Sequence, residues 1–323
     1  MCTAITYHNS GFYFGRTLDY ERSFGEEVVL TPRNFPLPFR QLPAWKQHHA
    51  ILGMAHVADG YPLYYDAMNE KGLCMAGLNF VGFARYVGEG QDKVAPFELL
   101  PWVLGQCEGV GEAERLLETL NLTNEPYNKD LPATPLHWMI SDQERSIVVE
   151  ATEEGLQVYE NPVGVLTNNP PFPFHLKNLA QYLNLTAEVP KNRFSETVDL
   201  QTFSRGMGAF GLPGDLSSPS RFIRAAFVKT NSLSKEGESV SQFFHILGAV
   251  EQQRGCVRLG KGKNEVTIYS SCCDLERGIY YYKTYENHSI TAVELGQENL
   301  ERNDLIIYPM KINQEMRMQN QKG

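Results

Sequence analysis

Residues 1–20 read MCTAITYHNSGFYFGRTLDY, and this stretch gives the strongest indication of the fold. A β-prone run from Cys2 to Tyr7 and a second run from Gly11 to Leu18 flank His8-Asn9-Ser10, a polar break typical of a turn. We therefore expect a β-hairpin that carries Cys2 at the open end of one strand.

Cys2 is chemically notable because of what it becomes if Met1 is removed. The thiolate is the nucleophile of cysteine chemistry, and an α-amine has an ordinary pKa of about 7.7–8. One residue then supplies both an attacking group and its base, as in N-terminal nucleophiles. Taken alone, a cysteine here is more simply interpreted as a small residue that permits removal of Met1.

The composition is that of a globular protein and excludes several functions. The 323 residues suffice for one large domain or two ordinary ones, and no repeat or clear linker divides them. A net charge of −9 argues against nucleic acid as a partner, and no apolar run approaches the roughly 20 residues of a membrane span. With no recognisable secretory signal, we expect a cytoplasmic protein without membrane insertion.

Six cysteines are present, but the sequence contains no CxxC pair. Free thiols are therefore expected rather than a disulfide framework or a zinc site. The adjacent Cys272 and Cys273 lie in a strand-like run, which predicts one buried and one outward thiol.

Strand and helix patterns alternate in blocks. Strands follow one another directly, which favours antiparallel pairing, and the helical apolar stripes must be buried against sheet faces. We expect an α+β protein with two sheets and helices packed outside them. Further strands are expected at 27–31, 51–57, 72–80, 136–141, 146–151, 155–159, 163–167, 265–271, 278–285, 290–295 and 305–310, and helices at 96–107, about 113–120, 172–185, 219–231 and 239–252.

Polar residues occur where they can meet Cys2. A return strand brings Arg16 and Asp19 back toward it, where an arginine favours a thiolate and an aspartate holds an ammonium group. Asn79 and Asn168 end two apolar runs, and an amide NH2 can serve an oxyanion. Each has a simpler interpretation, namely a surface ion pair, a strand cap or a turn. Arg221 follows Pro219 at the start of a predicted helix.

The run Gly206–Gly211 is a literal GxGxxG. A dinucleotide site also needs a hydrophobic strand before this motif and a helix starting on it. Pro213-Gly214 follows at once, so the glycines predict a loop within 187–218, a stretch rich in Gly, Pro and Ser. Residues 311–323 are predicted to be a polar tail.

Several segments together resemble one family. They are MCT at 1–3, GRTLDYE at 15–21, TPRNF at 31–35, NEKGL at 69–73, AGLNF at 76–80, LHWMISD at 136–142, VLTNNP at 165–170, GLPGDLSSPSRF at 211–222 and IYYYKTYEN at 279–287. As a set they resemble the choloylglycine hydrolases, a family of N-terminal-nucleophile hydrolases, over nearly the whole chain. Within the family the chain looks most like conjugated bile salt hydrolases of Gram-positive gut bacteria. Asn79 stands where the alternative, the penicillin V acylases, commonly have tyrosine.

The resemblance implies a four-layer αββα sandwich formed by residues 2–323 as a single domain, two antiparallel sheets lying between helical layers. It implies hydrolysis of glycine- and taurine-conjugated bile salts through a thioester, without metal or cofactor. Cys2 is then the nucleophile and its α-amine the base. The other implied catalytic residues are Arg16, Asp19, Asn79, Asn168 and Arg221, and the implied substrate contacts are Arg16, Asn79, Leu18, Leu131 and Tyr65.

The resemblance also implies a homotetramer in which residues 187–218 take part in assembly. The chain departs from the family at Cys74, where glycine is usual, and at Pro219 before the SRF segment; neither is an implied catalytic position. Transfer of the acyl group to another amine remains a side activity to consider. Penicillin V acylase-like hydrolysis of another amide and bile acid binding without catalysis remain the alternatives.

Overall fold

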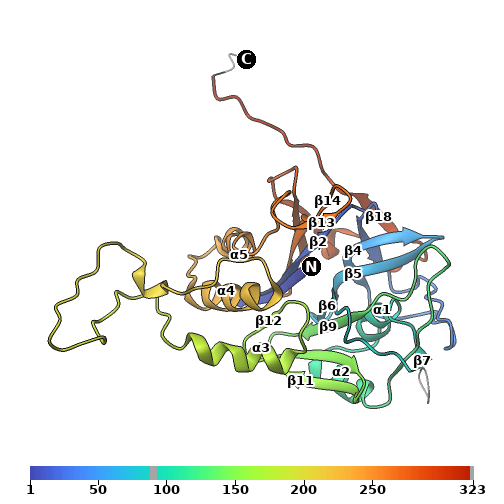
Figure 1. Ribbon diagram of the computed structural model, residues 1–323. Helices are drawn as coiled ribbons and strands as arrows, with labels where there is room; N and C mark the ends of the chain where they lie inside the picture. The colour runs from blue at the N-terminus through green and yellow to red at the C-terminus, as the bar shows by residue number, and fades with distance from the viewer. Residues whose placement is uncertain (88–92, 321–323) are drawn as a thin grey trace.

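The computed structural model describes residues 1–87 and 93–320. The N-terminal hairpin is confirmed, since strands β1 and β2 pair with Cys2 opposite Leu18. They belong to an antiparallel sheet of six strands (Figure 1). Its order is β12 (Val165–Leu166), β1 (Cys2–His8), β2 (Phe12–Tyr20), β15 (Val266–Asp274), β16 (Ile279–Thr284) and β17 (Thr291–Glu294).

A second antiparallel sheet has eight strands. Its order is β11 (Gly155–Glu160), β10 (Ser146–Thr152), β9 (Leu136–Ser141), β6 (Cys74–Asn79), β5 (Tyr61–Asn69), β4 (Ile51–Ala58), β3 (Glu27–Thr31) and β18 (Ile306–Pro309). Two short pairs complete the strands: β7 (Lys93–Val94) with β8 (Asn121–Leu122), and β13 (Arg258–Gly260) with β14 (Lys263–Asn264).

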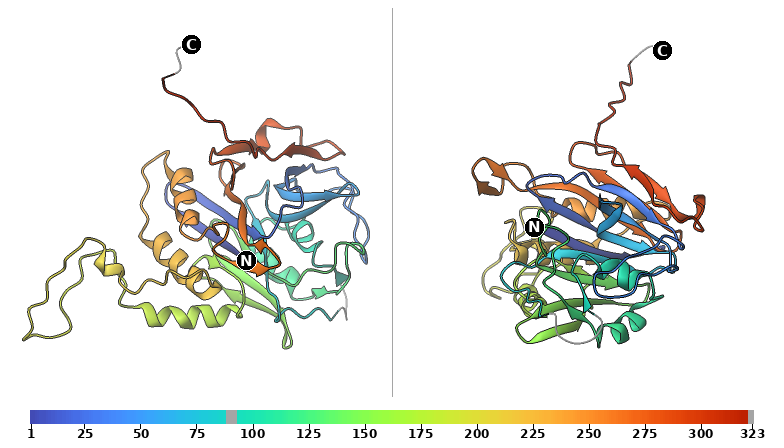
Figure 2. Two further views of the ribbon diagram at one scale, coloured as in Figure 1. Left: turned by 45° about the horizontal axis from the view of Figure 1, so that its top comes forward. Right: turned by 90° about the vertical axis from the view of Figure 1, so that its right-hand side faces the viewer.

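The two large sheets stack, because β1 and β2 contact β5 and β6 across the interface. Helix α4 (Ser218–Asn231) contacts β1 and β12, while α5 (Ser239–Gly248) contacts β2 and β15, and α3 (Phe172–Leu179) packs on α4. On the other side, α1 (Leu99–Leu104) contacts β5 and β6, and α2 (Val110–Leu117) joins the same core (Figures 1 and 2). The αββα sandwich is therefore confirmed.

The stacking buries strands on both faces and corrects one expectation. Cys272 and Cys273 are both fully buried, rather than one buried and one outward. Their strand β15 lies inside its sheet, with α5 on one face and the second sheet on the other, so neither side chain reaches solvent. Alternation along a strand reveals exposure only where one face meets water.

Several predicted elements are shorter in the structure. The helix expected at 96–107 is limited to α1, because the Glu98 carboxylate accepts hydrogen bonds from the backbone N–H groups of Ala95 and Arg40 and forms a turn there. The helix expected at 239–252 ends at Gly248 as α5. The helix expected at 172–185 is α3 followed by a 3-10 turn, Ala180–Tyr182.

The segment between α3 and α4 projects from the body, drawn in yellow in Figures 1 and 2. Its glycine motif forms a loop with the 3-10 turn Met207–Ala209, as predicted. Residues 311–320 are exposed, and residues 88–92 of the expected domain and 321–323 of the expected tail lie outside the described residues. Across 1–87 and 93–320, no helix combines the length and apolar character that crossing a membrane requires.

Candidate active site

Cys2 begins β1 and lines a cavity between the two sheets, with only 4% of its surface exposed. Pairing in β1 and β2 sets Cys2 opposite Leu18 and Ala4 opposite Arg16. Because side chains alternate along a strand, Arg16 and Leu18 share one face with Cys2. All three line the same cavity.

Arg16 joins the sheet of Cys2 to the other sheet. Its Nη1 donates to the carbonyl oxygens of Gly77, at 2.5 Å, and Tyr65, at 3.2 Å, while Nε donates to Thr17 O. The Nη2 atom is buried and has no hydrogen-bond partner among the described residues. Burial lowers the pKa of Arg16, but the nearby Cys2 and Asp66 groups raise it by more, so the net shift is upward. The side chain is therefore a cation whose Nη2 is available to a bound group.

Asp19 is fully buried close to the start of the chain. Its carboxylate accepts hydrogen bonds from Thr267 Oγ1 at 2.6 Å and from Thr17 Oγ1 at 3.1 Å. Burial raises the pKa of Asp19, opposed by the terminal amine and Arg221. The Met1 amine donates to the Asp19 carbonyl oxygen at 2.9 Å and pairs with Glu265.

Asn168 lies directly behind Cys2 rather than in the cavity. Its Oδ1 accepts a hydrogen bond from the Cys2 backbone nitrogen at 2.7 Å, and its Nδ2 donates to the Asn79 carbonyl oxygen at 2.8 Å. Sequence reasoning expected this amide to face the reacting group, whereas its oxygen faces the backbone nitrogen of Cys2.

Arg221 fixes this arrangement from α4. Its Nη1 donates to Cys2 O and Thr3 Oγ1, each at 2.6 Å, and its Nη2 donates to Asn168 Oδ1 at 2.7 Å. The side chain is fully buried, and burial lowers the pKa of Arg221 while Asp19 and Cys2 oppose this effect. One guanidinium therefore ties α4 to β1 and to Asn168 in the segment that follows β12.

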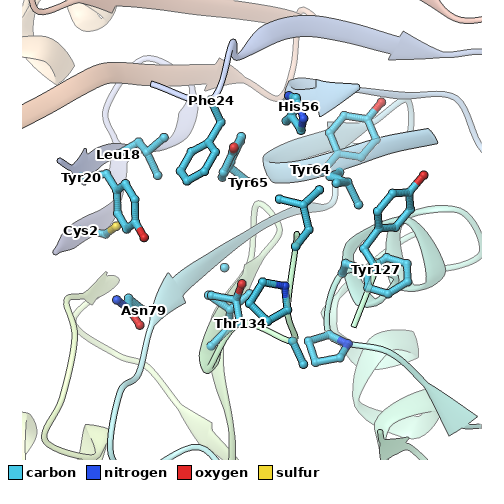
Figure 3. A pocket seen from close by; sticks show the side chains of 18 of the residues that line it. Cys2, Leu18, Tyr20, Phe24, His56, Tyr64, Tyr65, Asn79, Tyr127 and Thr134 are labelled. Carbon is cyan, nitrogen blue, oxygen red and sulfur yellow. The ribbon is translucent and has the colours of Figure 1, made fainter. Parts of the chain in front are cut away.

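Asn79, at the end of β6, places its side chain in the cavity near Cys2 (Figure 3). Its Oδ1 is buried and has no hydrogen-bond partner in the described parts of the chain. Because the two ends of an amide are interchangeable by rotation, the group is free to offer an N–H donor to a bound molecule.

The cavity has a volume of about 400 Å³. Leu18, Tyr65 and Leu131 line it, as the resemblance implied, and Figure 3 shows Cys2 and Asn79 at one end and Tyr127 at the other. Sequence reasoning missed most of the lining, which comes partly from strands β2, β4 and β5 and partly from loops without a motif. The missed aromatic residues are Tyr20, Phe24, Tyr64, Phe97 and Tyr127.

Two supporting hydroxyl groups were also missed. Ser218 Oγ accepts the Asn168 backbone N–H at 2.9 Å, and Thr267 holds the Asp19 carboxylate. Ser218 lies inside the quoted GLPGDLSSPSRF segment, so its motif was a usable signal. Thr267 lies 248 residues from Asp19 along the chain, and nothing in its local sequence indicates the contact.

Comparison with known proteins identifies a family whose sequence model matches most of the chain. The model of the linear amide C–N hydrolases, choloylglycine hydrolase family, matches residues 2–308. A bile salt hydrolase/transferase of Lactiplantibacillus plantarum is 56% identical over 315 residues, covering 96% of this chain and 97% of that protein. A bile salt hydrolase/transferase of Clostridium perfringens is 40% identical, covering 95% and 96%.

Comparison with solved structures gives a consistent result. A conjugated bile acid hydrolase from Clostridium perfringens superposes with a TM-score of 0.91 at 38% identity, covering 99% of this chain and 100% of the other. A penicillin V acylase from Agrobacterium tumefaciens superposes with a TM-score of 0.77 at 20% identity, covering 97% and 92%. The second likeness extends to the fold alone.

Proposed function

Because this chain belongs to the choloylglycine hydrolase family of linear amide C–N hydrolases, we propose that it hydrolyses the amide bond of glycine- and taurine-conjugated bile salts. The observation that carries the proposal is Cys2, which lies at one end of a largely apolar cavity of about 400 Å³ beside Arg16 and Asn79. An apolar cavity with a few convergent polar groups suits a steroid joined to a polar amide.

The reaction begins once Met1 is removed and the Cys2 nitrogen becomes an α-amine. Cys2 Sγ attacks the carbonyl carbon, and the α-amine takes the thiol proton. The tetrahedral intermediate collapses as the C–N bond breaks, and the departing glycine or taurine nitrogen takes a proton from the α-ammonium. Water then attacks the thioester and breaks the C–S bond, which releases the bile acid and restores Cys2.

Asn168 and Arg221 orient the base in this scheme. The neutral α-amine donates a hydrogen bond to Asn168 Oδ1, which lies 2.7 Å from the Cys2 nitrogen. Arg221 holds that oxygen from the other side at 2.7 Å. The lone pair of the amine is then directed away from Asn168 and stays available for the proton of the thiol.

The charges that develop during the reaction are stabilised by three side chains, those of Asn79, Arg16 and Asp19. Asn79 donates to the oxyanion, because its side chain lies in the cavity and its Oδ1 has no hydrogen-bond partner among residues 1–87 and 93–320. The free Nη2 of Arg16 stabilises the thiolate. Asp19 balances the α-ammonium that forms when the proton is taken.

We expect the purified protein to release glycine from glycocholate and taurine from taurocholate, and to act weakly on penicillin V. Amino acid release is measured with each conjugate, and phenoxyacetate release with penicillin V. Binding of the conjugates without release would favour a bile acid-binding protein instead. Faster turnover of penicillin V would favour the acylase alternative.

Acyl transfer is a second activity of the same thioester. Two of the relatives are bile salt hydrolase/transferases, and a thioester reacts with an amine as well as with water. When an amine attacks, the C–S bond breaks and a new conjugate forms instead of a free acid. Hydrolysis and transfer therefore compete at one intermediate.

We further propose that residues 2–323 act as one hydrolase domain that assembles as a homotetramer through residues 187–218. Phe194, Phe203 and Phe210 are at least 80% exposed in this projecting segment, and large exposed apolar side chains commonly mark an interface. A cytoplasmic location remains a prediction.

Light scattering of the full chain is expected to give four times its mass of 36.5 kDa. Replacing Phe194 and Phe203 together by serine should lower that mass, because it removes apolar area from the interface. A single-chain mass for the unchanged protein would contradict assembly.

A further inference from the structure

A buried pair of ionisable side chains lies behind the cavity and has no role in the scheme above. His137 on β9 and Glu150 on β10 are both fully buried, with His137 Nδ1 and Glu150 Oε1 2.9 Å apart. Neither residue lines the cavity. Burying such a pair is weak evidence for stability, because desolvation offsets the attraction.

The pair holds the segment that carries Asn168 at both ends. His137 Nε2 lies 2.9 Å from Thr167 O, and since a carbonyl oxygen only accepts, the ring nitrogen donates this hydrogen bond. Glu150 accepts the backbone N–H of Phe172 through Oε1 at 3.0 Å and Oε2 at 3.2 Å. Asn168 lies between these two points, so its position depends on both.

The same histidine contacts the strand end that carries Asn79. His137 lies opposite Leu78 in the pairing of β6 and β9. Its ring stacks on Phe80, with centroids 4.4 Å apart and planes inclined by 6°. Residues on both sides of Asn79 therefore contact His137. The Asn79 and Asn168 segments are also joined directly, because Asn168 Nδ2 donates to Asn79 O.

We propose that His137, held by Glu150, is a positioning residue that sets Asn79 and Asn168 relative to each other and to Cys2. The expected effect on catalysis rests on the proposed function, whereas the positioning of the two asparagines does not depend on it. His137 does not touch the substrate; it keeps the oxyanion donor and the acceptor for the α-amine in register. A displacement of about 1 Å in such groups can cost about 10²-fold in rate.

His137→Phe is the sharpest test, because it keeps a flat ring for Phe80 and removes both hydrogen bonds. We expect kcat to fall about 10- to 100-fold with KM changed less than about twofold. Cys2 alkylation by iodoacetamide should fall much less than kcat, since that reaction needs no oxyanion donor and depends only on the α-amine that Asn168 orients. Glu150→Gln should act in the same direction with a smaller effect, and His137→Gln should recover part of kcat by donating to Thr167 O.

A matched control exists on the same two strands. Ser141 Oγ on β9 donates to Ser146 Oγ on β10 at 2.8 Å, and both are buried. Ser141→Ala therefore also removes a buried hydrogen bond between β9 and β10, but away from both asparagines. Its kcat should match that of the unchanged protein.

Two further measurements separate positioning from general damage. In the Asn79→Ala background, His137→Phe should lower kcat by a smaller factor than it does in the unchanged protein, because residues acting through one another are not additive. Amide hydrogen exchange should speed up in 167–172 and 78–81 of His137→Phe and Glu150→Gln but not in 2–20.

The results overturn the proposal if kcat is unchanged in folded His137→Phe and Glu150→Gln, or if Cys2 alkylation falls in step with kcat. If His137→Phe does not fold, Glu150→Gln decides by the same measures. If the unchanged protein hydrolyses no conjugate, the proposed function fails, but amide hydrogen exchange still tests the positioning role. Faster exchange confined to 167–172 and 78–81 supports that role, and unchanged exchange there overturns it.

Discussion

Cys2→Ala is expected to lose all measurable release of glycine from glycocholate and of taurine from taurocholate. Alanine lacks the atom that forms the thioester, and no other thiol lines the cavity in the described residues. The substitution removes one small buried atom, so the fold and the binding of conjugates should persist. Cys2→Ser should also lose most activity, because a hydroxyl is a far weaker nucleophile at its free pKa.

The controls for this prediction come from the other cysteines. Cys256 is exposed and lies outside the cavity, so Cys256→Ser should keep full activity. Burial raises the pKa of the Cys74, Cys272 and Cys273 thiols, so alkylation at neutral pH should spare them. Intact mass must show that Met1 is absent, since a chain that keeps it has no free amine on Cys2. Full turnover by Cys2→Ala would refute the mechanism.

Asn79→Ala is expected to lower kcat by about 10²–10³, equivalent to roughly 3–4 kcal/mol of transition-state stabilisation. The buried Oδ1 of Asn79 accepts no hydrogen bond from the part of the chain that the structure describes, which leaves the amide to the bound substrate. An oxyanion exists only in the transition state and the intermediate, so KM should change little. Steady-state kinetics with glycocholate measures both constants.

Asn231→Ala is the matched control. This asparagine is exposed at the end of α4, where its Nδ2 donates to Phe227 O at 2.8 Å. Its replacement should leave kcat unchanged. A rise in KM for Asn79→Ala, with kcat preserved, would instead mean that Asn79 binds the ground state.

Local patterns in the sequence predicted most of the fold. The polar break at His8-Asn9-Ser10 was sufficient for the first hairpin, and the helical apolar pattern within 239–252 was sufficient to place α5. The burial of both Cys272 and Cys273 could not be predicted, because it depends on a helical layer contributed by other parts of the chain.

The site was predictable only in part, for a similar reason. Asn-Asn-Pro at 168–170 equally indicates a turn, and only the contact of Asn168 with Cys2, 166 residues away, assigns it to the site. Arg221 reaches Cys2 across 219 residues. His137 offers no periodic or spacing signal, since its partners come from β10 and from the residues that follow β12 and β6.

The contacts of the Met1 amine affect whether Met1 is removed before or after the chain folds. In the folded state this amine is held by Asp19 O and Glu265, and the residues after it are paired, with Cys2 opposite Leu18 and Ala4 opposite Leu166. A peptidase that removes Met1 must draw the same residues into its own active site. Excision and folding therefore compete for one short segment, and excision is easiest on the nascent chain. We therefore expect the share of molecules with a free Cys2 amine to depend on whether Met1 is removed before the sandwich closes.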